Sequence, residues 1–411
     1  MTRCSSQPPV ITSDVVVVGG GAAGLSLAYR LAADSTRTVT LVEAPDGPLR
    51  PPGRTWCYWE EGPGDFEEAV SASWSRLRVH GADGSPVTVA PFPMRYRMLR
   101  SERFERLVHA RLAQSPGAQV VRATAGAVRD VRGGAEVLCT MPDGGALTLR
   151  ARLVFDSRPL SALPPARTQL LQHFRGWFVR TAADRFDPEV ADLMDFRVPQ
   201  PRHGLAFGYV LPLAPDRALV EYTQFSRAPL DTATYDKALE HYGRAVLGLG
   251  AWDVEAVEQG VIPMTDGRFP RRAGRAVFRI GTAGGATRPA TGYTFAPVQR
   301  QSAAVAAGIR AGRAGVPPAH GRRALAMDAV LLRALDTGRI DGPAFFTGLF
   351  HRTPAHRLLR FLDGATSPWE EFGIGLRGPV GPMLRTAVEI PFVRRRPRPV
   401  PAASAPRERS R

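Results

Sequence analysis

An α/β fold is predicted, and three observations in the first 43 residues predict it. Residues 15–18 are four valines, the β-branched run expected of a strand buried on both faces. The spacing G-x-G-x-x-G follows at once, where a helix is expected to begin, and residues 39–42 form a second short apolar run. Strand, glycine-rich turn, helix and strand in this order indicate a dinucleotide-binding βαβ unit. The alternative is a glycine-rich turn in another kind of α/β protein.

Each position of this motif has its own task in a dinucleotide site. Gly19 permits the tight turn, Gly21 lets the backbone approach a pyrophosphate, and Gly24 lets helix and strand pack closely. The N-terminal end of the helix stabilises phosphate charge. Glu43, at the end of the second strand, is expected to accept hydrogen bonds from an adenosine ribose.

Composition limits the class of protein. The 411 residues suffice for two domains or one large composite domain. The three cysteines and eight histidines show no ligand spacing, so we expect no disulfide framework and no metal. No apolar run reaches the roughly 20 residues of a membrane-spanning helix, and residues 1–13 lack the apolar segment of a secretory signal. A cytoplasmic protein is predicted.

The formal net charge of +16 has two interpretations. Arginine supplies nearly all of it, and a bias toward Arg, Ala, Gly and Pro is typical of a GC-rich genome. The second interpretation is a positive surface that faces an anionic membrane. Nucleic-acid binding is not predicted, because the chain has neither a known module nor basic residues interleaved with aromatics.

Further elements are expected along the chain. A helix at 101–114 has Ser101 as its N-cap, and the meander that follows has turns at 132–134 and 142–145. Residues 44–93 lack a regular pattern. The remaining expected elements are a strand at 119–122, β structure over 169–265 with two strands in 205–226 joined by a turn at 214–217, a strand at 277–281, a helix at 297–311, amphipathic helices over 324–393, and a disordered tail at 394–411.

The late strand, glycine-rich turn and helix make the predicted fold more specific. Together with the βαβ unit and the meander, they indicate an FAD-binding Rossmann domain of the glutathione-reductase type. The turn is expected to approach the flavin through Gly281, Ala283, Gly284 and Gly292, with a plain loop as the alternative. The expected domains are a discontinuous FAD-binding domain (13–45, 97–160 and 270–323), a β-rich substrate domain (46–96 and 165–265) and a helical membrane-proximal region (324–393).

Several longer motifs carry a resemblance to a known family. These motifs are GGGAAGLSLA from Gly19, RTWCYWE from Arg54, QHFRGWFV at 172–179, LMDFRVPQ at 193–200, YVLPL followed by LVEYTQFS, and AGGATRPATGYTF at 283–295. From residue 14 to about 390, the chain resembles the flavin-dependent lycopene β-cyclases of bacterial carotenoid synthesis. It departs from flavin hydroxylases at Asp156-Ser157-Arg158 and at Gly281-Thr282, where hydroxylases usually carry Ala-Asp-Gly and Gly-Asp.

The resemblance implies a reaction and its cofactors. Members of the family add a proton to a terminal double bond of lycopene, close a ring on the resulting cation and release a neighbouring proton. They need reduced FAD, which NADPH or NADH keeps reduced, although no net electrons move. Other members commonly carry Asn-His-Thr-Trp where this chain has Gly53-Arg54-Thr55-Trp56. Cyclisation at one chain end or at both therefore stays open.

Two carboxylates match family motifs. Glu221 is expected to be the acid, because burial of its strand face would raise its pKa. An ordinary solvated glutamate is the alternative. Asp195 is expected to accept the departing proton, to orient Glu221 or simply to pair with Arg197. Aromatic side chains of the matching motifs are candidates to line the substrate pocket and stabilise the cation: Trp56, Trp59, Trp177, Phe207, Tyr209 and Tyr293.

Lycopene dissolves only in membranes, so a peripheral position on the inner face of the membrane is expected. Residues 345–362 mix apolar and basic residues, as an interfacial helix does, although a helix that packs on its own core has the same pattern. Two other functions stay open. One is an FAD-dependent monooxygenase or reductase that acts on an apolar isoprenoid, and the other is a non-catalytic flavin-containing carrier of carotenoids.

Overall fold

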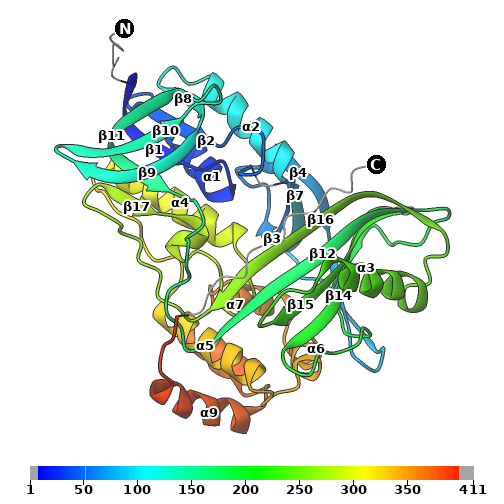
Figure 1. Cartoon of the computed structure of the whole chain (residues 1–411). Helices are drawn as coiled ribbons and strands as arrows, with labels where there is room; N and C mark the ends of the chain where they lie inside the picture. The colour runs from blue at the N-terminus through cyan, green and yellow to red at the C-terminus, as the bar shows by residue number, and fades with distance from the viewer. Residues whose placement is uncertain (1–7, 51, 398–411) are drawn as a thin grey trace.

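The computed structural model describes residues 8–50 and 52–397. Two seven-stranded sheets and one three-stranded sheet form the molecule, and helices close the end that lies at the bottom of Figure 1. Of the tail expected at 394–411, residues 398–411 lie outside the described ranges. Its first residues contact the protein: Arg396 pairs with Ala166, and Arg395 lies 3.3 Å from the Asp266 carboxylate.

The first sheet contains the predicted βαβ unit. Its strand order is β8-β2-β1-β11-β10-β9, with β17 beside β11. β9 and β10 form an antiparallel meander with β11, and the other neighbouring strands run parallel. The strands are β1 (Val10–Val18), β2 (Val39–Glu43), β8 (Ala118–Arg122), β9 (Thr124–Val131), β10 (Gly134–Thr140), β11 (Ala146–Asp156) and β17 (Val277–Arg279).

The four valines of β1 explain why this sheet is central. Val15 and Val17 pack with three helices, and Val16 and Val18 pack against the meander on the other face. Alternating side chains are therefore buried on both sides, as the apolar run predicts. The three helices are α1 (Ala22–Leu31), α2 (Ser101–Ala113) and α4 (Phe295–Arg310). This layered arrangement confirms the predicted glutathione-reductase-type class.

The start of α2 differs from the prediction by one residue. Arg100 is the N-cap, and Ser101 is the first helical residue. The Ser101 hydroxyl instead accepts a hydrogen bond from the backbone N–H of Arg54 at 2.8 Å. Ser101 therefore connects the backbone at Arg54 to the start of the helix instead of capping it.

The second sheet forms the β-rich part of the molecule. Its order is β16-β12-β15-β14-β13-β5-β6. Its long strands occupy the right side of Figure 1, with α3 (Thr232–His241) and the π-helical turn η2 (Tyr242–Val246) beside them. The strands are β5 (Arg76–His80), β6 (Pro86–Val89), β12 (Gln169–Thr181), β13 (Val190–Asp195), β14 (Leu205–Ala214), β15 (Arg217–Ser226) and β16 (Trp252–Thr265).

Residues 44–93, which showed no regular pattern, contribute strands to two sheets. The strands β5 and β6 extend the second sheet, because β5 runs parallel to β13. The third sheet has the order β3-β7-β4 and connects the two larger parts (Figure 1). Its strands are β3 (Thr55–Glu61), β4 (Val70–Trp74) and β7 (Met94–Arg100), with a short 3₁₀ turn, η1 (Glu67–Ala69), before β4.

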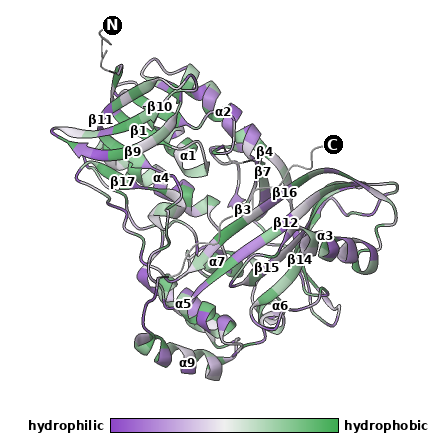
Figure 2. Cartoon of the chain, in the orientation of Figure 1, coloured by the Kyte–Doolittle hydropathy of each residue, from purple (hydrophilic) through white to green (hydrophobic). Residues whose placement is uncertain are grey.

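Helices form the C-terminal part. They are α5 (Arg322–Asp336), α6 (Gly342–Arg352), α7 (Ala355–Leu362), α8 (Pro368–Gly375), α9 (Val380–Glu389) and the 3₁₀ turn η4 (Ile390–Phe392). Residues of α5 to α8 share one hydrophobic core with the second and third sheets. Apolar segments lie in the buried strands and also along α9, at the outer edge of the molecule (Figure 2). In the described ranges, each helix is too short or too polar to cross a membrane.

Candidate functional site

The glycine-rich turn after β1 has the conformation that its sequence requires. Gly19 has a φ of +103°, which favours glycine. A Cβ on Gly24 would lie 1.9 Å from the Gly19 carbonyl oxygen, so α1 approaches β1 more closely than any side chain allows. A Cβ on Gly21 would meet nothing within 4 Å, and no side chain caps the N-terminus of α1. Open space therefore lies in front of free backbone N–H groups.

Glu43 lies beside this turn. It is almost fully buried, and a Cβ on Gly20 would lie 2.5 Å from its Oε1. The carboxylate accepts a hydrogen bond from His109 Nε2 at 3.1 Å and lies 3.2 Å from an Arg122 nitrogen. The sequence analysis missed His109 and Arg122, because neither belongs to the βαβ motif. Glu105, which lies near Glu43 and His109, is likewise ion-paired with Arg122.

The late glycine-rich turn meets the first one. Gly281 has a φ of +63°, and a Cβ there would lie 2.7 Å from the Cβ of Ala23 in the first turn of α1. The 3₁₀ turn η3 (Gly281–Gly284) follows, and Ala283 and Gly284 are buried in it. The two predicted cofactor segments, whose contacting residues Ala23 and Gly281 are 258 positions apart in sequence, are thus adjacent in space.

The segment before α4 contains a glycine with positive φ and lies next to polar atoms that have no hydrogen-bond partner among the described residues. Gly292 has a φ of +71°, and a Cβ there would lie 2.1 Å from Gln172 Oε1. Gln172 Oε1 and Thr291 Oγ1 are buried and have no hydrogen-bond partner among the described residues. Both residues line a pocket, as does Thr294, the N-cap of α4, whose side chain does not cap the helix. The pocket wall therefore offers polar groups that a ligand can satisfy.

A buried ion pair fixes this turn to the C-terminal helices. Arg288 Nε lies 2.9 Å from Asp328 Oδ2 of α5, and both side chains are buried. Burial raises the pKa of Asp328 to about 6, and Arg288 opposes that rise. The helical region thereby helps to position the late turn.

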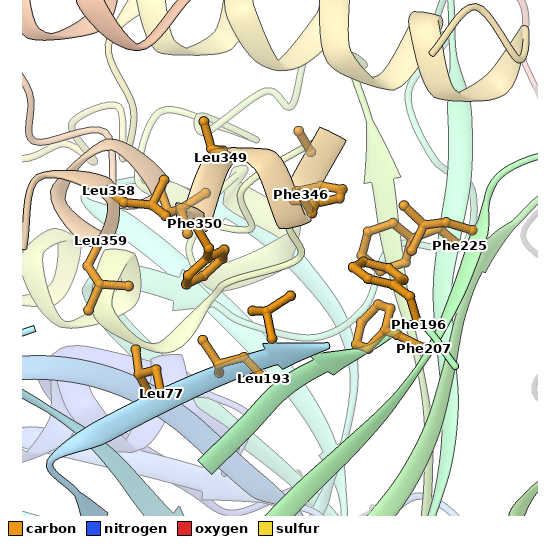
Figure 3. Packing of buried hydrophobic residues seen from close by; sticks show 14 of the residues in the cluster. Leu77, Leu193, Phe196, Phe207, Phe225, Phe346, Leu349, Phe350, Leu358 and Leu359 are labelled. Carbon is orange, nitrogen blue, oxygen red and sulfur yellow. The ribbon is translucent and has the colours of Figure 1, made fainter. Parts of the chain in front are cut away.

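The pocket lies between the late turn and the second sheet. Strands β3, β7 and β12 to β16 form its walls, and α6 and α7 cover it. Figure 3 shows Phe346 and Phe350 of α6 facing Leu193, Phe207 and Phe225 of the sheet. Most of this lining is apolar or aromatic, which is the character of a site for an apolar ligand.

Glu221 lies in this pocket, on β15. Its side chain is 7% exposed, and its Oε1 accepts a hydrogen bond from the Thr223 hydroxyl at 2.5 Å. Burial, with a smaller contribution from nearby Glu258, raises the pKa of Glu221 to about 8. The carboxyl is therefore protonated at neutral pH, as an acid requires.

Glu258 is a second pocket carboxyl, and the sequence analysis missed it. It lies on β16 and is 8% exposed. Its Oε2 accepts a hydrogen bond from the Thr55 hydroxyl at 2.6 Å and lies 3.7 Å from Arg100 Nη1. Burial raises its pKa, while Thr55 and Arg100 lower it. The pairing of β12 with both β15 and β16 is what brings Glu258 near Glu221, and residue order alone does not specify that pairing.

Most of the predicted aromatic residues lie at the pocket. Trp56, Phe207, Tyr209 and Tyr293 line it. Trp56 stacks on Phe295, with 5.7 Å between ring centroids, and the Tyr209 hydroxyl lies 2.7 Å from that of Tyr96. Trp59 packs edge-on against Tyr293 at 4.6 Å, behind the lining.

Trp177 corrects one expectation. It packs with the core on the opposite face of the second sheet, near α3. Side chains alternate along a strand, and Gln172 and Phe174 of β12 line the pocket. Trp177, at an odd position of the same strand, therefore points away from it.

Asp195 also differs from the expectation of a catalytic role. It is fully buried but outside the pocket, where it pairs with Arg197 at 2.5 Å and accepts a hydrogen bond from the Tyr242 hydroxyl at 2.9 Å. The register of β13 shifts between Asp192 and Asp195, which turns the side chain toward α3 and η2. Of the three expected roles, the structure supports the ion pair with Arg197.

The segment 345–362 packs inward. Its large apolar residues are buried in the core that covers the pocket (Figure 3), with Phe345 and Phe361 partly buried. Of the two interpretations of its pattern, the structure therefore supports a helix that packs on its own core.

Comparison with known proteins gives the family. A family model described as lycopene cyclase protein matches residues 14–388. The chain belongs to this family. The resemblance that the motifs carry is thereby confirmed over almost the whole chain. No curated protein matches the chain.

Solved structures show which fold this lycopene cyclase family member has. A flavoprotein/dehydrogenase from Cytophaga hutchinsonii aligns with a TM-score of 0.60 at 13% identity, covering 93% of this chain and 99% of that chain. A geranylgeranyl bacteriochlorophyll reductase-like protein from Thermoplasma acidophilum gives 0.58 at 16% identity, covering 93% and 98%. The flavin-dependent monooxygenase PieE, in complex with FAD and substrate, gives 0.55 at 15%, covering 93% and 72%. At these identities the likeness shows the fold alone.

Proposed function

We propose that the protein is a lycopene cyclase that converts a linear carotene to β-ring products without net oxidation or reduction. The observation that carries this proposal is Glu221, a protonated carboxyl in an aromatic pocket beside the late glycine-rich turn. Membership of the lycopene cyclase family supports the same reaction. The products would be γ-carotene after one ring and β-carotene after two.

FAD is the proposed cofactor, and the residues present fit it. Gly21 leaves room for a pyrophosphate at the N-terminus of α1, and Glu43 lies beside the same turn. The unpaired Gln172 Oε1 and Thr291 Oγ1 offer partners to the polar edge of a flavin. When bound in its reduced form, the flavin supplies negative charge close to a developing cation. We propose NADPH or NADH as the reductant.

The protein's own groups would carry the proton and protect the cation. Glu221 holds the proton and donates it to the terminal double bond of the carotene. The faces of Trp56, Phe207 and Tyr293 can stabilise the tertiary cation by roughly 0.5–2 kcal/mol each. The apolar cover of α6 and α7 excludes water, which would otherwise trap the cation as an alcohol.

The carotene has to enter from a lipid phase, and the last helices offer a surface for one. Large apolar residues follow one another at spacings of three or four, with exposed fractions from 38% to 84%: Trp369, Phe372, Leu376, Val380, Leu384, Val388 and Phe392. We call this set the α8–η4 stripe. Within each helix, such spacing places the residues on one side, and large exposed apolar patches mark interaction sites.

An anionic bilayer is the partner that we propose for the α8–η4 stripe. Arg385 and Arg394 are exposed close to it, and the chain has a net charge of +16. The inner sides of α8 and α9 contribute Ile374 and Met383 to the core that covers the pocket. A carotene leaving the bilayer at this stripe would therefore have a short path to Glu221. This position corresponds to a cytoplasmic protein attached peripherally to the inner face of the membrane.

Expression in cells that accumulate lycopene tests the proposed function. Pigment analysis should show carotenes with one or two β-rings. Glu221→Gln should lower ring formation by about 10²–10⁴-fold, the usual contribution of a general acid, while the flavin spectrum persists. Glu255→Gln, an exposed position on β16, is the matched control and should cyclise normally.

Two outcomes would contradict the proposal. Unchanged lycopene with reduced flavin demonstrably bound to the wild type would reject the cyclase. Oxygen-dependent consumption of NADPH with an oxygenated product would instead identify a monooxygenase.

A further inference from the structure

Strand register places four residues in one row across the second sheet. Tyr209 on β14 is opposite Glu221 on β15, Glu221 is opposite Gly176 on β12, and Gly176 is opposite Glu258 on β16. Residues directly opposite one another share a face of the sheet. Strands are spaced by about 4.8 Å, so the backbones of the two glutamates are roughly 10 Å apart.

Gly176 places no side chain between the two glutamates of the row. A Cβ there would lie 2.8 Å from Leu219 Cδ1 and 3.4 Å from the Cβ of Glu221. The side chains of Leu219 and Glu221 therefore lie close against the backbone at Gly176. Glu221 and Glu258, one on either side of Gly176 in the row, both line the pocket.

The two carboxyls have different partners. The Thr223 hydroxyl donates to Glu221, whereas Glu258 accepts from Thr55 and lies near the Arg100 guanidinium. Two adjacent buried carboxyls do not both ionise readily, and a neighbouring cation decides which one keeps the charge. Arg100 therefore favours the negative charge on Glu258 and the proton on Glu221. The other titratable groups near this pair are Arg54, Cys57, Tyr96, Glu102, Tyr209 and Tyr293, and Tyr235 lies on the opposite face of the sheet.

We propose that Glu258 is the catalytic base that accepts the proton at the end of cyclisation, while the reacting end of the carotene lies in the pocket that Glu221 and Glu258 both line. This inference rests on the proposed cyclase function and names a second catalytic residue for it. Glu221 gives its proton to the terminal double bond, and the π electrons of a nearby double bond then form the ring bond to the cation. A ring C–H bond breaks, its electrons form the new double bond, and its proton goes to Glu258.

The proton balance closes without an oxidant or reductant. After ring closure Glu221 is a carboxylate and Glu258 a carboxylic acid. Transfer of one proton back from Glu258 to Glu221 restores the starting state. Tyr209, next to Glu221 in the row and 2.7 Å from Tyr96 through its hydroxyl, stays neutral because burial raises its pKa well above the usual value.

Glu258→Gln tests this assignment in the flavin-loaded full-length protein. Ring formation should fall by about 10²–10⁴-fold, while Glu255→Gln on the same strand leaves it unchanged. The infrared carbonyl band of protonated Glu221, identified by its absence in Glu221→Gln, should titrate at a lower pH in Glu258→Gln than in the wild type. The reason is that one negative charge has been removed from beside it.

Several outcomes separate this inference from the proposed function. If the wild type forms rings and Glu258→Gln forms them at the same rate, Glu258 is not the base, although the protein is a cyclase. A Glu221 titration at the same pH in both proteins would also overturn the pairing. If Glu258→Gln does not fold, Glu258→Asp keeps the charge and should retain partial activity, and complete inactivity of a folded Glu258→Asp with an intact flavin spectrum would overturn the assignment. A wild type without ring formation would instead reject the proposed function itself.

Discussion

At the scale of single residues, two glycines of one motif have different surroundings. A Cβ on Gly24 would lie 1.9 Å from a backbone oxygen, whereas a Cβ on Gly21 would meet nothing within 4 Å. Gly21→Ala should therefore fold, with a thermal midpoint close to that of the wild type, but lose flavin because the new methyl group occupies the space for the pyrophosphate. Gly24→Ala should lose both stability and flavin. Flavin absorbance and circular dichroism measure the two effects, and full flavin content in Gly21→Ala would contradict the assigned site.

The raised pKa of Glu221 predicts a direction for activity. The protonated form of Glu221 is the donor, so ring formation should fall as pH rises through about 8. It should also fall at acidic pH, where Glu258, the proposed base, becomes protonated. A rate profile with purified protein and carotene in liposomes measures this. If ring formation instead falls with rising pH around pH 5, Glu221 has an ordinary pKa and is not the donor.

The same shift predicts the sign of an effect on stability. The folded state keeps the Glu221 proton up to about pH 8, whereas the unfolded chain loses it at its ordinary, lower pKa. The folded state therefore binds more protons in this window, and its stability falls as pH rises through it. Glu221→Gln should gain stability relative to the wild type between pH 5 and pH 8, as denaturant titrations at both values would show.

Residues that carry a motif were predictable, and residues that depend on strand pairing were not. The sequence placed Glu221 on an apolar strand face, and the structure has it there. Glu258 is paired with Gly176, which lies 82 residues earlier in the sequence, so no local pattern indicates its neighbours. Of the roles expected for Asp195, the structure supports the ion pair with Arg197, and Trp177 lies outside the pocket. A bulge and the parity of β12 decide which face each one occupies.

At the scale of elements, α9 and its neighbours predict a testable attachment. The double variant Leu384→Glu/Val388→Glu changes two exposed side chains of the α8–η4 stripe, so the fold should persist. Binding to vesicles with anionic phosphatidylglycerol should fall, because carboxylates replace apolar groups and face a negative surface. Leu49→Glu, an equally exposed leucine far along the chain, is the control.

Sedimentation with vesicles gives a clear decision. Loss of binding in the double variant but not in the control supports the α8–η4 stripe as the membrane surface. Equal binding of both variants would place the membrane contact elsewhere on the protein.

Elements with a strong period were predictable, and short strands joined by irregular turns were not. The βαβ unit, the meander and the hairpin of β14 and β15 follow the sequence pattern closely. The strands β3 to β6 lie in a Pro-, Gly- and Trp-rich segment whose alternation is interrupted, and they are stabilised by distant partners such as β13 and β7. The interfacial interpretation of 345–362 was wrong because an amphipathic pattern does not say what covers its apolar side.

At the scale of the whole molecule, the proposed flavin site joins segments from the entire chain. The first turn, Glu43, Gln172 and the late turn come together around it. Bound FAD should therefore raise the free energy of unfolding of the whole chain, by about 2.7 kcal/mol when the concentration of free FAD is 100 times its dissociation constant. Differential scanning calorimetry with and without added FAD would show a higher midpoint for the wild type. Gly21→Ala should show no such increase, and an equal increase would place the FAD elsewhere.

The overall class and the order of segments were predictable because the two glycine-rich turns mark their own places. The domain ranges expected from sequence stay a prediction. The β-rich and helical parts share one hydrophobic core, and Arg288 and Asp328 connect the late turn to α5. Such long-range packing is set by surfaces that a linear pattern does not display.

The carboxyl row has a consequence for the order in which products form. It lies at one position on one sheet, whereas a linear carotene has two equivalent ends far apart along its length. The two termini would therefore cyclise in succession. The monocyclic carotene must leave the pocket and bind again by its other terminus before the second ring can form. Early in a time course the monocyclic species should rise first and then decline, and a large excess of fresh starting material should trap it.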